Sequence, residues 1–146
     1  MAERVREQLL RHVPPGARVT LALSGGVDSI VALDILARLA RSHPFALSCV
    51  HVNHGISPNA AVWAKFASAA ARRRGVRCAV RTVDRRPYRQ LGPEGAARAA
   101  RYAVFARLRS EFVVLAQHQD DQAETVLLQL VRGAGLPGLA AMPAIR

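Results

Sequence analysis

The stretch Leu21-Ala22-Leu23-Ser24-Gly25-Gly26-Val27-Asp28-Ser29 decides how this chain is organised. The apolar run that ends at Leu23 predicts a buried strand, and the turn signal Ser24-Gly25-Gly26 follows it at once. Helical spacing begins at Val27, with apolar residues recurring at steps of three and four. A strand, a glycine turn and a helix in this order aim backbone N–H groups and a helix N-terminus at an anion.

The residue types of this loop favour a phosphate group as that anion. Gly25 and Gly26 can take positive φ and let a phosphate approach the backbone, and Ser24 and Ser29 add hydroxyl donors. Asp28 is badly placed to hold phosphate directly, so we expect Mg²⁺ between this carboxylate and the phosphates of a nucleotide. The loop has neither a Walker A ending nor a dinucleotide fingerprint. A glycine turn capped by serines in any α/β protein is the plain alternative.

Strand and helix patterns alternate along the rest of the chain. We expect strands over 18–23, 45–52, 76–83 and 112–116, and helices over 2–12, 27–41, 60–74, 94–109 and 120–131. This alternation predicts an α/β fold in which a parallel sheet carries helices on both faces. In the helix over 60–74 we expect the inward stripe to consist of Val62, Phe66, Ala69 and Ala70.

Polar clusters occupy 24–29, 51–55 and 117–124, each after a predicted strand. Because ligands of parallel sheets bind at the carboxyl ends of the strands, we expect one edge to collect all three clusters. In the last of them, Asp121 and Glu124 are one helical turn apart and project from one face. Helix capping would explain an acid at 120 or 121, but not His118 before it or Glu124 after it. Asp121 and Asp28 together could hold Mg²⁺.

Histidines and amides near this edge allow another kind of site. His51, Asn53, His54 and His118 could form a transition-metal site, although their spacing carries no metal signature.

Arginines have two interpretations in this chain. Arg98 and Arg101 could be a solvated stripe or a phosphate clamp, for which forked guanidinium donors are suited. The run from Arg72 to Arg89 holds eight arginines against Asp84 alone, and it is either a solvated face or a landing place for RNA phosphates. Tyr88 is its only aromatic residue, so base stacking has little support there.

Composition narrows the class of protein. A chain of 146 residues is expected to form one domain, and its net charge of +11 fits a polyanionic partner such as nucleic acid. No apolar run approaches the roughly 18 residues of a membrane span, and no signal-peptide core begins the sequence, so we expect no membrane partner. Cys49 and Cys78 lie in apolar strand-like runs, which predicts reduced, buried thiols and a cytoplasmic location.

Five stretches, in this order, together resemble tRNA(Ile)-lysidine synthetase, a family of the ATP pyrophosphatase or PP-loop superfamily. They are Ser24-Gly-Gly-Val-Asp-Ser29, His51-Val-Asn-His-Gly55, Ala97-Arg-Ala-Ala-Arg-Tyr102, His118-Gln-Asp-Asp-Gln-Ala-Glu-Thr125 and Arg132-Gly-Ala-Gly-Leu-Pro-Gly-Leu139. The resemblance implies a Rossmann-like PP-loop fold, with ATP and Mg²⁺ as cofactors. It also implies a reaction, in which ATP adenylates the wobble cytidine of an isoleucine tRNA and free L-lysine then displaces AMP.

The same resemblance implies roles for individual residues. The nucleotide would be bound by Ser24, Gly25, Gly26, Val27, Asp28, Ser29, His51, Val52, Asn53, Arg132 and Gly133. The catalytic residues would be Asp28, Arg98, Arg101, His118, Asp121 and Glu124, with Asp28 and Asp121 on the metal.

The chain as a whole would then be a single ATP-binding catalytic domain over 1–146, within a longer protein whose further domains grip the tRNA. A homodimer is one arrangement that this allows. Two rival functions remain open at this point. A PP-loop tRNA thiolation enzyme would share the loop but normally needs paired or exposed cysteines. A non-catalytic nucleotide-binding module would keep the glycines without needing the carboxylates.

Overall fold

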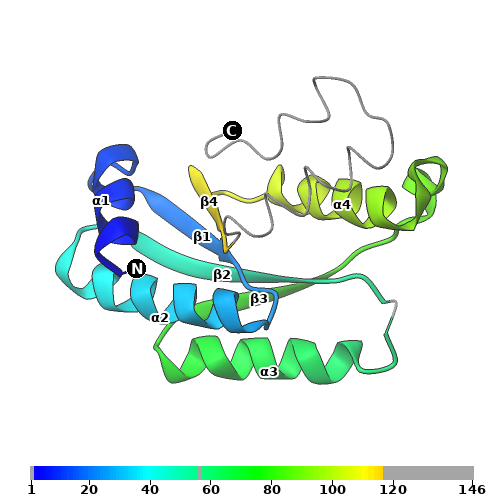
Figure 1. The fold of residues 1–146 in the computed structure, drawn as a ribbon, viewed down its shortest axis with the longest axis horizontal. Coiled ribbons are helices and arrows are strands. Elements are labelled where there is room, and N and C mark those ends of the chain that lie inside the picture. The colour runs from blue at the N-terminus through cyan, green and yellow to red at the C-terminus, as the bar shows by residue number, and fades with distance from the viewer. Residues whose placement is uncertain (1, 56, 117–146) are drawn as a thin grey trace. The chain divides into compact units, whose positions relative to one another are not determined.

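The computed structural model describes residues 2–55 and 57–116, and within them one parallel sheet runs in the order β3-β2-β1-β4 (Figure 1). The strands are β1 (Arg18–Ala22), β2 (Ala46–Asn53), β3 (Arg77–Thr82) and β4 (Phe112–Leu115). The helices are α1 (Ala2–His12), α2 (Val27–Ser42), α3 (Ala60–Arg73), the 3₁₀ helix η1 (Arg86–Leu91) and α4 (Gly92–Phe105). The expected α/β fold is confirmed, while the helix expected over 120–131 lies outside the described residues.

The topology places the candidate loop at a reversal of strand order. The chain builds β1, β2 and β3 outward in one direction and then returns to place β4 on the other side of β1. Right-handed crossovers therefore put α2 and α3 on one face of the sheet and α4 on the other, as Figure 1 shows. The carboxyl end of β1, where the order reverses, is the usual ligand position in such sheets.

The core is built around the central strand β1. Val19 and Leu21 on β1 and Leu33 and Leu36 on α2 are fully buried. On β2, Cys49 is buried as well. Burial on this scale stabilises each large aliphatic side chain by about 1.5–3 kcal/mol, so it fixes the strand that ends at the candidate loop.

The inward face of α3 differs from the expected stripe. Val62 and Phe66 are 62% and 47% exposed, and the buried positions of α3 are instead Ala64, Ala67, Ala70 and Ala71. Of the expected inward residues, only Ala70 is therefore fully buried. These alanines also follow helical spacing, and their small side chains let α3 pack closely on β2 and β3. The size of the apolar side chains therefore does not predict which face of α3 is buried.

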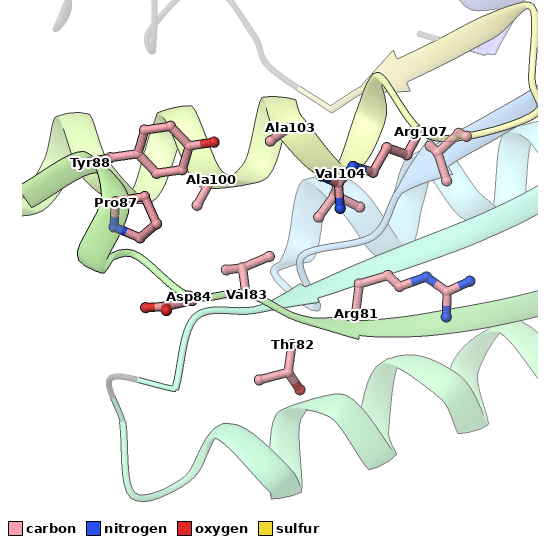
Figure 2. Close-up of a pocket in the computed structure, with 11 residues that line it drawn as sticks. Arg81, Thr82, Val83, Asp84, Pro87, Tyr88, Ala100, Ala103, Val104 and Arg107 are labelled. Carbon is pink, nitrogen blue, oxygen red and sulfur yellow. The ribbon is translucent and has the colours of Figure 1, made fainter.

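The segment over 84–93, which lies between the expected strand over 76–83 and the expected helix over 94–109, is mostly helical. It contains η1 and the beginning of α4, and α4 ends at Phe105 instead of continuing to 109. Pro87 stands in the first turn of η1, where its missing N–H group breaks no helical hydrogen bond. A groove lies between the carboxyl end of β3, η1 and α4 (Figure 2).

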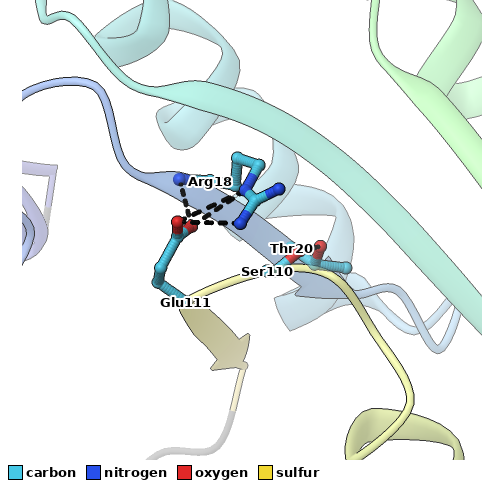
Figure 3. Close-up of polar contacts among 4 residues, drawn as sticks. All are labelled: Arg18, Thr20, Ser110 and Glu111. Carbon is cyan, nitrogen blue, oxygen red and sulfur yellow. Dashed lines mark hydrogen bonds and ion pairs between the residues drawn. The ribbon is translucent and has the colours of Figure 1, made fainter.

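Polar contacts at the start of β4 fix this strand against β1 (Figure 3). Glu111 accepts hydrogen bonds from the backbone N–H of Arg18 at 2.7 Å and from its guanidinium Nη2 at 3.0 Å. These hydrogen bonds lower the pKa of Glu111 to about 2. The buried hydroxyl of Thr20 bonds to Ser48 Oγ on β2 at 2.8 Å and also to Ser110 Oγ. The three strands β2, β1 and β4 are thus connected by side chains as well as by the backbone ladder.

Candidate nucleotide site

The glycine loop leaves β1 at the edge of the sheet and leads directly into α2. Leu23 N–H still donates to the carbonyl of Val50 at 2.8 Å, which keeps the chain attached to β2 before it turns. Gly25 has φ +95°, a conformation that favours glycine, whereas Gly26 has an ordinary φ of −71°. The turn therefore requires glycine at 25 for its backbone geometry.

Ser29 organises the loop from the first turn of α2. Its side chain is buried, and its Oγ donates to the carbonyl of Gly26 at 2.8 Å. The same oxygen accepts from Gly25 N–H and from Ser24 Oγ, each at 3.0 Å. Ser24 Oγ in turn accepts from Gly26 N–H at 3.3 Å. The two hydroxyls expected to contact phosphate thus make hydrogen bonds within the loop, holding it in a defined shape.

The N-terminus of α2 offers backbone donors beside this loop. Gly26 is its N-cap residue, and as a glycine it has no side chain with which to form a capping hydrogen bond. The first N–H groups of an α-helix lack intrahelical acceptors, and the helix dipole adds partial positive charge at that end. Val27 and Asp28 are exposed in this first turn. The arrangement can accept an anion such as a phosphate group.

Two of the residues expected to bind the nucleotide hold the neighbouring backbone. His51 is 6% exposed, and its Nδ1 lies 2.8 Å from the carbonyl of Leu23, to which a protonated Nδ1 donates. Asn53 Oδ1 accepts from Gly55 N–H at 2.8 Å, which closes the turn after β2. Val52 lies between them on β2 and is half-buried. His51 and Asn53 therefore position the strand end next to the loop.

His54, Arg85 and Arg101 lie at the same edge, after β2, after β3 and on α4 respectively. We refer to them as the cationic cluster, whose positive charge comes from the two arginines. His54 Nδ1 and Arg101 Nε are buried, and neither has a hydrogen-bond partner among the described residues. Burial lowers the pKa of His54, and the positive charges of Arg101 and Arg85, with His51, lower it further. Two guanidinium groups, one of them with an unpartnered Nε–H donor, are what a bound anion would satisfy.

The structure separates the two arginines that the sequence placed together. Arg101 belongs to the cationic cluster and is half-buried, whereas Arg98, one turn earlier on α4, is exposed. His54 was expected only as part of the alternative transition-metal site, and Arg85 only as a member of the arginine run; neither was expected to bind the nucleotide. His54 stands within the motif that begins at His51, so its position in that motif was an available signal. Arg85 was hidden in a run of arginines that gave no means of choosing one of them.

The arginine run from Arg72 to Arg89 does not form one surface. Arg74, the C-cap residue of α3, pairs with Asp34 on α2 at 3.2 Å, and Arg86 pairs with Asp84 at 2.8 Å. Arg81 is exposed on β3, while Arg85 belongs to the cationic cluster. Some arginines of this run therefore form ion pairs, Arg81 is exposed, and Arg85 contributes to the cationic cluster.

The two cysteines are neighbours inside the sheet and are free thiols. Cys49 on β2 lies opposite Cys78 on β3 in the parallel register. Burial, and to a lesser extent Cys78, raises the pKa of Cys49 to about 12, and burial also raises the pKa of Cys78. Both are protonated at neutral pH, and a thiol in that state is a poor nucleophile.

Several expected site residues lie outside the described residues: His118, Asp121, Glu124, Arg132 and Gly133. Within the described ranges, no three His, Cys, Asp or Glu side chains gather as a metal site would require. This leaves Asp28, at the first turn of α2, as the described carboxylate of the expected metal pair. None of the helices in the described ranges has the length and apolarity that crossing a membrane requires.

Comparison with curated proteins identifies relatives named tRNA(Ile)-lysidine synthase. The protein of Azoarcus sp. (strain BH72) is 48% identical over 133 residues, which are 91% of this chain and 30% of that protein. The protein of Nitrosomonas europaea is 45% identical over 140 residues, covering 94% of this chain and 30% of that protein. The chain thus spans about a third of the length of these relatives.

Comparison with solved structures and with protein families agrees on the fold. The U34-tRNA thiolase NcsA from Methanococcus maripaludis, solved with its [4Fe-4S] cluster, superposes with a TM-score of 0.80 at 22% identity, covering 95% of this chain and 51% of that one. At that identity the likeness concerns the fold alone. The family described as the PP-loop domain matches residues 1–146 in full. With the glycine loop, the uncapped helix and the parallel sheet in place, the chain belongs to the PP-loop domain family.

Proposed function

We propose that this chain is the ATP-cleaving catalytic domain of a tRNA(Ile)-lysidine synthase. The observation that carries the proposal is the loop from Ser24 to Ser29, which presents backbone donors and the uncapped α2 N-terminus at the carboxyl end of β1. The identity of 45–48% to relatives of that name supports the choice of reaction. The substrates would be ATP, an isoleucine tRNA and free L-lysine.

The chemistry has two steps. The C2 oxygen of the wobble cytidine attacks the α-phosphate of ATP, a P–O bond forms, and pyrophosphate leaves. The ε-amine of lysine then attacks C2, a C–N bond forms, the amine loses a proton, and AMP leaves. A loose phosphoryl transition state needs positioning and charge neutralisation more than a protein nucleophile. This requirement fits a site made of backbone donors and arginines.

Each described group has a task in this scheme. The N–H groups at the start of α2 would bind the leaving pyrophosphate, and the hydrogen bonds around Ser29 would hold the loop in place for it. Arg101 and His54 would donate their unpartnered N–H groups to phosphate or substrate oxygens. Mg²⁺, when bound, would neutralise phosphate charge, and Asp28 is the described carboxylate able to hold it.

The two rival functions differ from this proposal in cysteine chemistry and in products. A thiolation enzyme of this superfamily would need a reactive cysteine, yet the raised pKa values of Cys49 and Cys78 keep both protonated. A module that only binds nucleotide could use the same unpartnered groups, and it differs in releasing neither AMP nor pyrophosphate.

Product analysis with the intact protein tests the proposal. Incubation with radiolabelled ATP, lysine and the tRNA should yield AMP and pyrophosphate, and AMP formation should depend on both co-substrates. ADP and orthophosphate as the primary products would exclude this reaction. Asp28→Asn keeps the shape of the side chain and removes its charge, so it should lower Mg²⁺-dependent turnover by more than about tenfold, or roughly 1.4 kcal/mol of barrier. A near-parental rate at limiting Mg²⁺ would remove Asp28 from the metal site.

A further inference from the structure

A groove of about 380 Å³ separates the carboxyl end of β3 from α4 and lies apart from the glycine loop (Figure 2). We refer to it as the β3–α4 groove. Its lining residues come from the end of β3 and the segment after it, from η1, and from α4 with the turn that follows it. They are Arg81, Thr82, Val83, Asp84, Pro87, Tyr88, Ala100, Ala103, Val104, Arg107 and Leu108.

The floor of the β3–α4 groove is apolar and its rim is basic. Small and branched side chains such as Ala103 and Val104 line it from α4, and Val83 lines it from the opposite side. Figure 2 shows Arg81 on the β3 side and Arg107 at the end of α4. Apolar side chains between two cations suit a ligand that has a planar ring and negative charges at its ends.

The charge of the rim is not cancelled by the acid that lies there. Asp84 is the one acid among the lining residues, and its carboxylate accepts from Arg86 Nε at 2.9 Å and pairs with Arg86 Nη2 at 2.8 Å. These hydrogen bonds lower the pKa of Asp84 and keep it ionised and occupied. Neither Arg81 nor Arg107 forms an ion pair within the described ranges, so both guanidinium groups can receive an anion.

Tyr88 supplies an aromatic ring to the same groove. It lies in η1, and Figure 2 shows its ring beside Ala100 of α4. Sequence alone gave base stacking little support, because Tyr88 is isolated among arginines in the chain. The fold changes that assessment by placing the ring next to an apolar floor, where a nucleobase can stack and exclude water from both surfaces.

The location of the groove relates it to the reacting centre. β3 lies two strands away from β1, or roughly 10 Å at the usual strand spacing, and the groove and the glycine loop both follow carboxyl ends of the same parallel sheet. Asp84 and Ala100, which line the groove, are followed in the chain by Arg85 and Arg101 of the cationic cluster. The groove therefore adjoins the cationic cluster, and a polyanion bound at the cluster can extend into the groove.

We propose that the β3–α4 groove holds an unpaired nucleotide of the RNA substrate, next to the nucleotide that reacts. Its base would stack against Tyr88 and the α4 floor, and its flanking phosphates would bind Arg81 and Arg107. This rests on the proposed function, which makes RNA a substrate, and it adds a subsite for that RNA. Free lysine is disfavoured because its ammonium group would face two guanidinium groups. The triphosphate of ATP already has the glycine loop.

Two kinds of variant of the intact protein test the phosphate and base contacts separately. Arg81→Gln and Arg107→Gln each remove one cation, and Arg11→Gln removes an exposed cation from α1, which packs on α2 away from the groove. With the anticodon stem-loop of the tRNA as ligand, each groove variant should lower the slope of log affinity against log salt by about 0.7–0.9. Arg11→Gln should keep the parental slope.

The base contact is tested by changing Tyr88 and the RNA together. Tyr88→Ala should weaken stem-loop binding about fivefold or more, the ~1 kcal/mol low end of base–aromatic stacking, while Tyr88→Phe should bind as the parent does. A stem-loop with an abasic nucleotide beside the wobble position should bind parent and Tyr88→Ala equally. Urea unfolding of each variant verifies that the protein is folded.

The outcomes separate this subsite from the proposed function. Parental slopes in both arginine variants, or loss of ATP or lysine affinity instead of RNA affinity, overturn the subsite even if AMP and lysidine are made. Lower slopes and a Tyr88-dependent base contact support the subsite, and they do so even if the parent fails to release AMP. In that last case the reaction is wrong and the RNA contact stands.

Discussion

Replacing Gly25 by alanine should damage the glycine loop through its backbone. Gly25 has φ +95°, and an added Cβ would lie 3.8 Å from Phe66 Cδ1, which is an ordinary contact. The cost therefore comes from the backbone conformation, at about 1–2 kcal/mol, less roughly 0.4–1 kcal/mol for the reduced freedom of the unfolded chain. We expect a net loss of about 1 kcal/mol in the free energy of unfolding, measured by urea denaturation.

The functional loss should be larger than this stability change accounts for. Relief of the strain would move the Gly25 N–H group away from Ser29 Oγ, to which it donates at 3.0 Å, and the loop would lose the shape that binds phosphate. We expect ATP turnover to fall by more than about tenfold. Gly75→Ala is the matched control, because Gly75 has φ +72°, has nothing within 4 Å of an added Cβ, and follows α3. Equal losses of turnover in the two variants would refute the specific role of the loop.

Three other predictions concern separate features. Glu111→Gln should remove an acid-sensitive contribution to stability: the lowered pKa of Glu111 stabilises the fold above about pH 4.5 and ceases to do so as pH falls toward 2, so urea midpoints of parent and variant should converge across this range. Cys49→Ser should keep near-parental turnover. In the native parent, Cys49 should resist a thiol reagent at pH 8, because burial raises its pKa to about 12. Rapid modification of Cys49 would contradict this burial argument. Arg101→Gln should lower kcat/KM by about tenfold or more, and Arg98→Gln should lower it much less. The reason is that Arg101 is half-buried in the cationic cluster, whereas Arg98 is exposed. A larger loss of kcat/KM in Arg98→Gln than in Arg101→Gln would exclude the cluster from the site.

Sequence predicted the architecture because strand patterns and turn residues are local signals. The apolar run before Ser24 and the helical spacing after Gly26 suffice to position a loop at the carboxyl end of β1. Alternation of strands and helices then makes a parallel sheet, and the handedness of crossovers limits which face each helix covers. The order β3-β2-β1-β4 itself depends on strand pairing, which sequence periodicity does not specify.

The inward face of α3 shows where hydrophobicity misleads. Val62 and Phe66 have the larger apolar side chains and alternate with helical spacing, yet they are exposed. The alanines at 64, 67, 70 and 71 allow the helix axis to approach the sheet, so that α3 packs closely on β2 and β3. Phe66 instead lies next to Gly25, at the glycine loop. A hydrophobic residue on a helix can therefore belong to the surroundings of a site rather than to the core.

The cationic cluster shows why the site could be predicted only in part. His54, Arg85 and Arg101 are far apart in the chain, and they meet because β2 and β3 end at one edge of the sheet while α4 carries Arg101 back beside them. Nothing local distinguishes Arg85 from Arg86, although Arg86 is neutralised by Asp84 and Arg85 lowers the pKa of His54. What distinguishes them is whether an acid is within reach after folding. Charge in the sequence thus predicts that this protein meets a polyanion, while only the fold decides which cations remain available to bind it.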